Sequence, residues 1–139
     1  DYGTDLLGTW TPPRTRTTMR VLVQCKAGGS RVGPSYIREL EGAFVGAPPG
    51  WRGAGVLALL VSGRPATKGV RDGMGRSRWP MGYVFMEEDG EVKQMIWNRR
   101  AEEEGLEGFS MTTRHGQEGK TELALTKNGK VLPLLERRE

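Results

Sequence analysis

Three polar residues near the start of the chain have the types and the spacing to bind a divalent metal and a phosphate. Asp5 offers a carboxylate, Gln24 an amide oxygen and Lys26 an ammonium group. Mg²⁺ prefers a few oxygen ligands and shares the phosphate of its substrate, and a nearby lysine can offset charge on that phosphate. These three residues are therefore our candidate site.

The elements that carry these residues follow from the sequence pattern. Apolar residues alternate with Gln24 and Lys26 over residues 20–26, which predicts a half-buried strand with both polar side chains on one face. Residues 5–10 predict a second strand, and the proline-containing link between the two predicts a turn. A hairpin centred near Thr15 would place Asp5 opposite the Gln24 to Lys26 end, with opposed Cβ atoms about 5 Å apart.

The next elements predict a parallel crossover. Pro34 opens a helix whose apolar stripe is Ile37, Leu40 and Phe44, and which ends near Gly46. The apolar run at residues 55–61 is typical of a fully buried strand. Strand, helix and strand in this order favour parallel neighbours in a sheet.

The rest of the chain predicts one more helix and a strand-rich C-terminal part. A helix is expected to start at residues 62–65 and to be weakened by three glycines. Residues 83–86 and 92–97 predict a hairpin, and Asn98 is expected to cap a short helix that Gly105 stops. A final meander is expected from three strands, at residues 109–114, 122–127 and 130–135.

Asp5, Gln24-x-Lys26 and the following helix resemble the PD-(D/E)xK restriction-endonuclease-like superfamily, specifically its Mrr-type branch. Later stretches, at residues 95–98, 105–108 and 122–126, are similar to fungal mitochondrial proteins required for respiratory growth, which are described as restriction-endonuclease-like. The resemblance implies an α/β fold with a restriction-endonuclease-like core, a central mixed sheet flanked by helices, and C-terminal β-hairpins. One domain over residues 1–139 is expected, with the nuclease core at 1–90 and a β-rich extension at 91–139.

The resemblance also implies the roles of the site residues. Asp5 would ligate Mg²⁺ or Mn²⁺, with the Gln24 side chain and the Cys25 carbonyl as further ligands, and Lys26 would orient or deprotonate the attacking water. Gln24 lacks the charge of the usual carboxylate, so metal affinity should be weaker. The helix and Glu that usually precede the Asp strand are absent before Asp1, so we expect a fragment or a processed chain.

Charge and composition limit the partners and the compartment. The net charge of +4 permits a polyanionic partner, and we expect phosphate contacts from Arg14, Arg16, Arg64 and Lys68. The resemblance to the Mrr-type branch, in which the region after the central strand approaches the DNA, implies Ser62 as a further phosphate contact. One Cys and one His exclude a zinc cluster or a disulfide framework within the chain, which favours an intracellular location. No run of about 18 apolar residues could span a membrane.

The expected function is metal-dependent hydrolysis of DNA by a mitochondrial nuclease linked to respiratory competence. Three alternatives remain open: a catalytically inactive nucleic-acid-binding module, an interaction or assembly factor for mitochondrial complexes, and an enzyme that acts on RNA. Nucleases of this type often act as dimers, which leaves a homodimer open as well.

Overall fold

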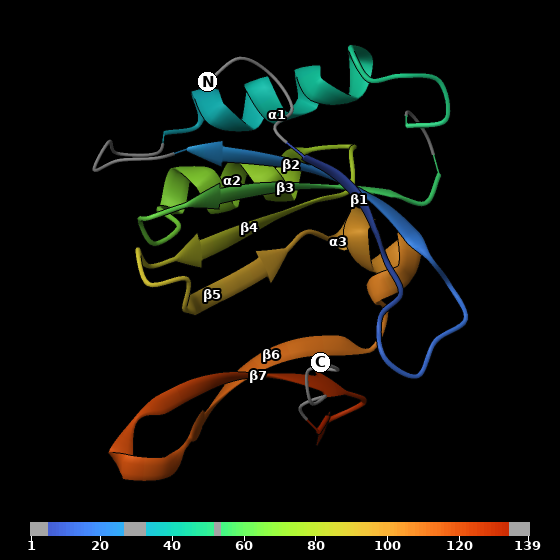
Figure 1. Ribbon diagram of the computed structural model, residues 1–139. Helices are drawn as coiled ribbons and strands as arrows, with labels where there is room; N and C mark the ends of the chain where they lie inside the picture. Colours follow the sequence, from blue (N-terminus) through green and yellow to red (C-terminus); the bar gives the residue numbers. More distant parts are fainter. Residues whose placement is uncertain (1–5, 27–32, 52–53, 134–139) are drawn as a thin grey trace. The chain divides into compact units, whose positions relative to one another are not determined.

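The computed structural model describes residues 6–26, 33–51 and 54–133, and the chain divides into two compact units, Asp1–Glu107 and Gly108–Glu139. The first unit contains a five-stranded sheet (Figure 1). Its strands, in spatial order, are β1 (Leu6–Trp10), β2 (Met19–Lys26), β3 (Val56–Ser62), β4 (Met81–Met86) and β5 (Val92–Trp97).

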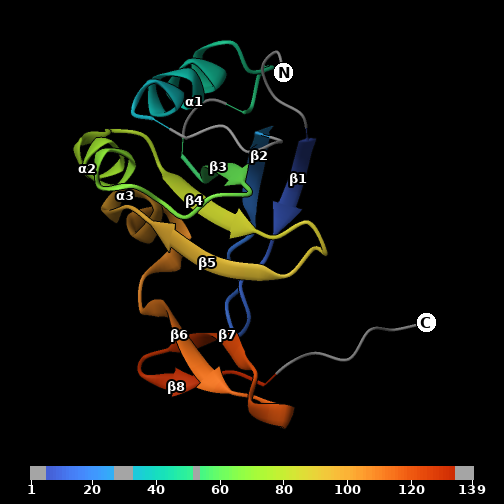
Figure 2. The same cartoon turned by 90° about the vertical axis from the view of Figure 1, so that its left-hand side faces the viewer.

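Strand directions make this a mixed sheet, as predicted. β2, β3 and β4 run parallel, while the two outer strands β1 and β5 are antiparallel to their neighbours. Helix α1 (Ser35–Val45) connects β2 to β3, and helix α2 (Lys68–Arg76) connects β3 to β4. Figure 2 shows the two helices next to each other on one side of the sheet. The parallel crossover that the sequence predicted is therefore confirmed.

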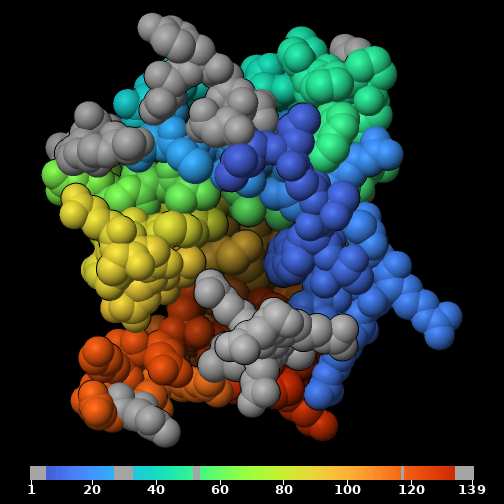
Figure 3. Space-filling model, in the orientation of Figure 1, coloured from blue at the N-terminus to red at the C-terminus, as the bar shows by residue number. Residues whose placement is uncertain are grey.

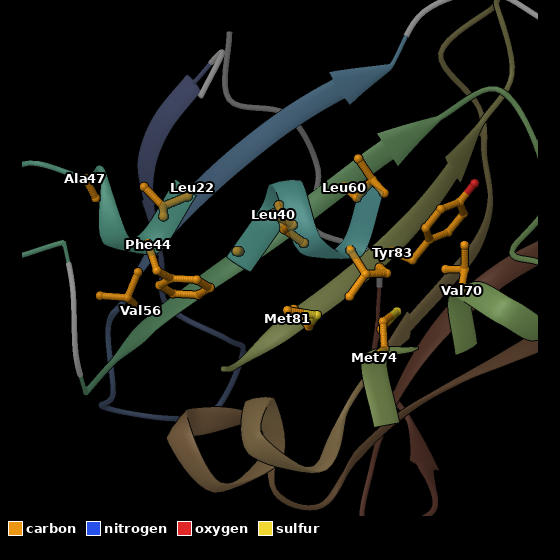
Figure 4. Close-up of a cluster of buried hydrophobic side chains, with 12 residues drawn as sticks. Leu22, Leu40, Phe44, Ala47, Val56, Leu60, Val70, Met74, Met81 and Tyr83 are labelled. Atoms are coloured by element: carbon orange, nitrogen blue, oxygen red, sulfur yellow. The ribbon is translucent and has the colours of Figure 1, made fainter. Parts of the chain in front are cut away.

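The core of this unit lies between the two helices and one face of the sheet (Figure 4). The α1 stripe of Ile37, Leu40 and Phe44 is buried, as the helical spacing predicted. It packs with Val70 and Met74 of α2 and with strand residues such as Leu60 and Tyr83. Burial of such side chains, at roughly 25 cal/mol per Å² of apolar surface, is the main force that holds α1 and α2 on the sheet.

The prediction that a helix starts at residues 62–65 is wrong. Ser62 is the buried last residue of β3, and α2 begins only after Thr67, whose hydroxyl accepts a hydrogen bond from the Val70 amide at 3.2 Å. Pro65 explains the delay, because a residue before proline is disfavoured in the helical region. Thr67 then supplies the N-cap that Ser62 cannot provide from inside the sheet.

The glycines of α2 have a packing role that the sequence analysis did not foresee. A Cβ at Gly69 would lie 2.9 Å from Pro34 Cγ, and one at Gly73 would lie 3.4 Å from Ile37 Cγ1. One turn further on, the Ser77 hydroxyl donates to Glu41 at 2.8 Å. Small residues at a spacing of four thus let α1 approach α2 closely along one face.

The β1–β2 hairpin has the predicted register. Leu6 pairs with Val23 and Trp10 with Met19, and the Thr15 amide donates to the Pro12 carbonyl at 3.2 Å in the connecting turn. β1 is the edge strand, with Leu6 61% exposed, and its dark blue atoms lie at the surface in Figure 3.

The last part of the first unit follows the sequence prediction closely. Residues 87–91 turn β4 into β5, with the Glu91 amide donating to Asp89 at 2.9 Å. Asn98 caps helix α3 (Arg99–Ala101) by accepting from the Ala101 amide at 3.0 Å. A π-helical turn, η1 (Glu102–Leu106), continues from it. The short helix after Asn98 is thus confirmed, although Gly105 lies inside the π turn.

The second unit is a small antiparallel sheet of β6 (Phe109–His115), β7 (Thr121–Lys127) and β8 (Lys130–Val131), with a 3-10 turn, η2 (Gln117–Gly119), before β7. Asn128 and Gly129 have φ angles of 49° and 83°, as the tight turn predicted between the last two strands requires. Among the described residues, no helix is long and apolar enough to cross a membrane.

Candidate functional site

Gln24 and Lys26 lie on the helix-covered face of β2, close to its carboxyl end. In the parallel ladder Gln24 pairs with Leu60, and Lys26 pairs with Ser62, the last residue of β3. The two side chains share a face, as the alternation predicted. That face packs against α1, so the helix supplies the next residues of the site.

Lys26 is held by two side chains of α1. Its Nζ donates to Glu39 Oε2 at 2.8 Å and lies 4.9 Å from the centre of the Tyr36 ring. The Lys26 side chain is 16% exposed, whereas that of Glu39 is 51% exposed. A half-exposed ion pair of this kind contributes about 0–1 kcal/mol to stability after solvent screening, so stability alone is a weak reason for it. The pair does place a carboxylate and an ammonium group together at the carboxyl end of β2.

Gln24 is the most unusual polar residue of the site. It is 3% exposed, and its side-chain oxygen Oε1 has no hydrogen-bond partner among the described residues. An unpaired buried polar atom costs roughly 1–3 kcal/mol, so native structures seldom keep one without a use. An amide oxygen is also a ligand type that hard divalent cations accept. The donor chemistry of Gln24 and Glu39 therefore fits a divalent metal.

The sequence predicted two further metal ligands, Asp5 and the carbonyl of Cys25. Asp5 lies outside the described residues, although Leu6, the residue that follows it, is paired with Val23, the residue that precedes Gln24. Cys25 is half-buried in β2, on the face opposite to Gln24 and Lys26, and pairs in register with Val61. Its carbonyl stays a predicted ligand only.

Three side chains of the sheet, two of them buried, fix the loop that follows β3. The Ser62 hydroxyl accepts from the Arg64 amide at 3.2 Å, and the Tyr83 hydroxyl donates to the Arg64 carbonyl at 2.6 Å. Further along, Gln94 Oε1 accepts from the Ala66 amide at 3.0 Å. Burial raises the pKa of Tyr83 above its usual range, and the hydrogen bond with Ser62 acts in the opposite direction.

The predicted phosphate contacts fall into two groups. Ser62, Arg64 and Lys68 follow the carboxyl end of β3, next to the end of β2 that carries Lys26; Lys68 is exposed and pairs with Asp72 at 3.1 Å. Arg14 and Arg16 are exposed in the β1–β2 turn, at the opposite end of β2. Because β2 rises about 3.3 Å per residue, these two arginines lie roughly 20 Å away along the strand. The structure thus brings only the first group towards Lys26.

Sequence reasoning missed Glu39 and Tyr36. Both lie on the flank of α1 that faces the end of β2, one helical turn apart. The available signal was their three-residue spacing beside the buried stripe, in a helix that closely follows a strand ending in lysine. The sequence analysis assigned this helix only a packing role, because it considered the Gln-x-Lys strand as the source of the site residues.

The fold and the site define an α/β protein whose mixed sheet presents polar groups at the carboxyl edge of its parallel strands. Comparison with known families places the chain more narrowly. Residues 13–114 match the model of the family "Required for respiratory growth protein 7", so the chain belongs to that family. No curated protein and no solved structure matches the chain.

Proposed function

We propose that this chain is a metal-dependent nuclease with a restriction-endonuclease-like core, which hydrolyses phosphodiester bonds of DNA in mitochondria. The observation that carries the proposal is the buried Gln24 oxygen, which has no partner in the described part of the chain, beside the Lys26–Glu39 pair at the carboxyl end of β2. The family name supports the link to respiratory growth and, through it, the mitochondrial location. The antiparallel β1–β2 hairpin followed by a parallel crossover supports the proposed core.

Each of the site residues has a proposed role. Gln24 and Glu39 would hold Mg²⁺ or Mn²⁺, together with Asp5, and Glu39 restores a negative charge that Gln24 lacks. When bound, the metal would activate water and polarise the phosphate. Lys26 offsets negative charge on the phosphate and orients water, and the Tyr36 ring limits the directions that its ammonium group can take.

An acidic turn elsewhere is a weaker place for the metal. Glu87, Asp89 and Glu91 have carboxylate oxygens within 4.8 Å of one another, but all three are exposed. Glu91 also pairs with Lys93 at 3.1 Å. No buried unpaired oxygen accompanies them among the described residues.

Cleavage of supercoiled plasmid in Mg²⁺ or Mn²⁺ tests the proposal. Lys26→Ala, Asp5→Ala and Glu39→Gln should each abolish nicking, and EDTA should do the same. Glu41→Gln is the matched control. Glu41 lies on the same helix as Glu39, but it accepts a hydrogen bond from Ser77, the residue after α2, and does not pair with Lys26. Wild-type protein that leaves plasmid and single-stranded RNA intact would refute hydrolysis.

A catalytically inactive nucleic-acid-binding module is the second candidate. It is favoured by the Lys26–Glu39 pair, which occupies the lysine in the absence of a ligand. In that case wild type, Lys26→Ala and Glu39→Gln would bind DNA without cutting it. If the wild-type protein shows no salt-dependent DNA binding at all, the result would instead favour a protein partner.

A further inference from the structure

The loop between β3 and α2 is fixed more firmly than an exposed connection needs. Ser62, Tyr83 and Gln94 each give it a side-chain hydrogen bond, and two of these bonds hold the backbone of the same residue, Arg64. Exposed loops of this kind usually have freedom to move. Here the Arg64 amide and carbonyl are both tied to the sheet.

The two side chains that bond Arg64 are themselves buried. Tyr83 is fully buried and Ser62 is 3% exposed, whereas Arg64 is exposed. Figure 4 shows the Tyr83 ring among the core side chains, with its hydroxyl pointing towards the carboxyl ends of β3 and β4. The hydroxyl group of a core residue, Tyr83, therefore reaches the loop and holds the Arg64 carbonyl.

The fixed loop lies directly beside the candidate site. Ser62 pairs with Lys26 across the β2–β3 ladder, and neighbouring strands are about 4.8 Å apart. A planar guanidinium is well suited to bind phosphate oxygens, and a fixed backbone lowers the entropy lost on binding. Arg64 is thus presented at the same edge as the ammonium group of Lys26.

We propose that Tyr83 is a positioning residue which, through the Arg64 backbone, holds the Ser62–Ala66 loop as a clamp for a backbone phosphate of the nucleic acid beside Lys26. The inference rests on the proposed function for its substrate. Tyr83 does not touch the nucleic acid; it acts through Arg64. Gln94 supports the same loop from β5.

Binding of a fluorescein-labelled 20-base-pair DNA duplex in EDTA tests the inference, because no cleavage occurs without metal. Arg64→Gln should make the negative slope of log Kobs against log salt concentration shallower by about 0.9, which is an affinity loss of roughly eightfold at 0.1 M salt. Tyr83→Phe removes one hydroxyl and should cause a smaller loss. In the Arg64→Gln background Tyr83→Phe should cause no further loss, since it acts through Arg64.

Arg99→Gln is the control, because Arg99 follows β5 at the opposite edge of the sheet and should leave the slope unchanged. If Tyr83→Phe folds poorly, Gln94→Leu takes its place as the test. Gln94→Leu removes a different bond to the same loop and should cause a similar loss of affinity. Additive losses in the double variant, an unchanged slope in Arg64→Gln, or no DNA binding by the wild type would each overturn the inference. Binding that follows the expected pattern without any plasmid cleavage would refute the nuclease proposal and leave the clamp standing.

Discussion

Replacing the glycines of α2 one at a time by alanine tests how this helix holds α1 in place. Gly75 has no atom within 4 Å of an added Cβ, so Gly75→Ala should gain the usual helix benefit of about 0.5–1 kcal/mol. Gly73→Ala would meet Ile37 Cγ1 at 3.4 Å, a tight but adjustable contact, and should be close to neutral.

Gly69→Ala should have the opposite sign. Its Cβ would lie 2.9 Å from Pro34 Cγ, so the start of α1 or of α2 must shift. Overpacking of this kind costs about 1–3 kcal/mol, which offsets the helix benefit and leaves a net loss of roughly 0–2.5 kcal/mol. Because both variants share the helix benefit, Gly75→Ala and Gly69→Ala should differ by the overpacking cost alone, about 1–3 kcal/mol.

Urea unfolding followed by tryptophan fluorescence measures these free energies. All four tryptophans lie within the first unit, so the signal does not mix in the small C-terminal sheet. Trp79 stacks on Phe44 with ring centres 4.6 Å apart and therefore reports on α1 directly. The packing argument fails if Gly69→Ala is as stable as Gly75→Ala. Because α1 carries Glu39, Gly69→Ala should also weaken any activity of the site, whereas Gly75→Ala should not.

Three further results are expected. Asn98→Ala should cost about 2–4 kcal/mol in the same unfolding assay, because its buried amide donates to Met74 and Trp79 carbonyls at 2.9 Å and accepts from two backbone amides. Tyr83→Phe should lessen the loss of stability at alkaline pH: burial raises the pKa of Tyr83 above 10.0, so the unfolded state loses its proton first and the wild type loses stability as pH rises past that value. An equal fall in the urea midpoint of the two proteins between pH 8 and pH 10.5 would contradict this. Glu39→Gln should lower stability by less than about 1 kcal/mol, so a much larger loss in urea unfolding would point to a structural role for the pair.

The sequence predicted the elements whose pattern is local. Alternation over residues 20–26, the helical stripe of Ile37, Leu40 and Phe44, and the turn at Asn128 and Gly129 all appear in the structure as expected. Each depends on a short period or on turn residues with a defined conformational preference. Such signals do not need information about distant parts of the chain.

The sequence did not predict relations between elements. The glycines of α2 looked unfavourable for a helix, and only the position of Pro34 and Ile37 in α1 explains them. The start of α2 was placed too early because residues 62–65 have the composition of a helix start, while the burial of Ser62 in β3 depends on pairing with Lys26 and Phe85. The two strand residues that bond the loop after β3 come from much later in the chain: Tyr83 bonds Arg64 from 19 residues away, and Gln94 bonds Ala66 from 28 residues away.

In the candidate site too, the sequence predicted what is local and did not predict what a distant element contributes. The Gln-x-Lys spacing identified two of its residues, but it also predicted a site poor in negative charge, because Gln24 stands where a carboxylate is usual. The structure changes that electrostatic argument, since α1 brings Glu39 to 2.8 Å from Lys26. A carboxylate that arrives from a helix can serve the same cation as one in the strand, provided that the helix is held at a fixed distance from the sheet. In this chain the small residues of α2 set how closely α1 approaches α2, so the glycines that weaken one helix help to position the other helix, which carries Glu39.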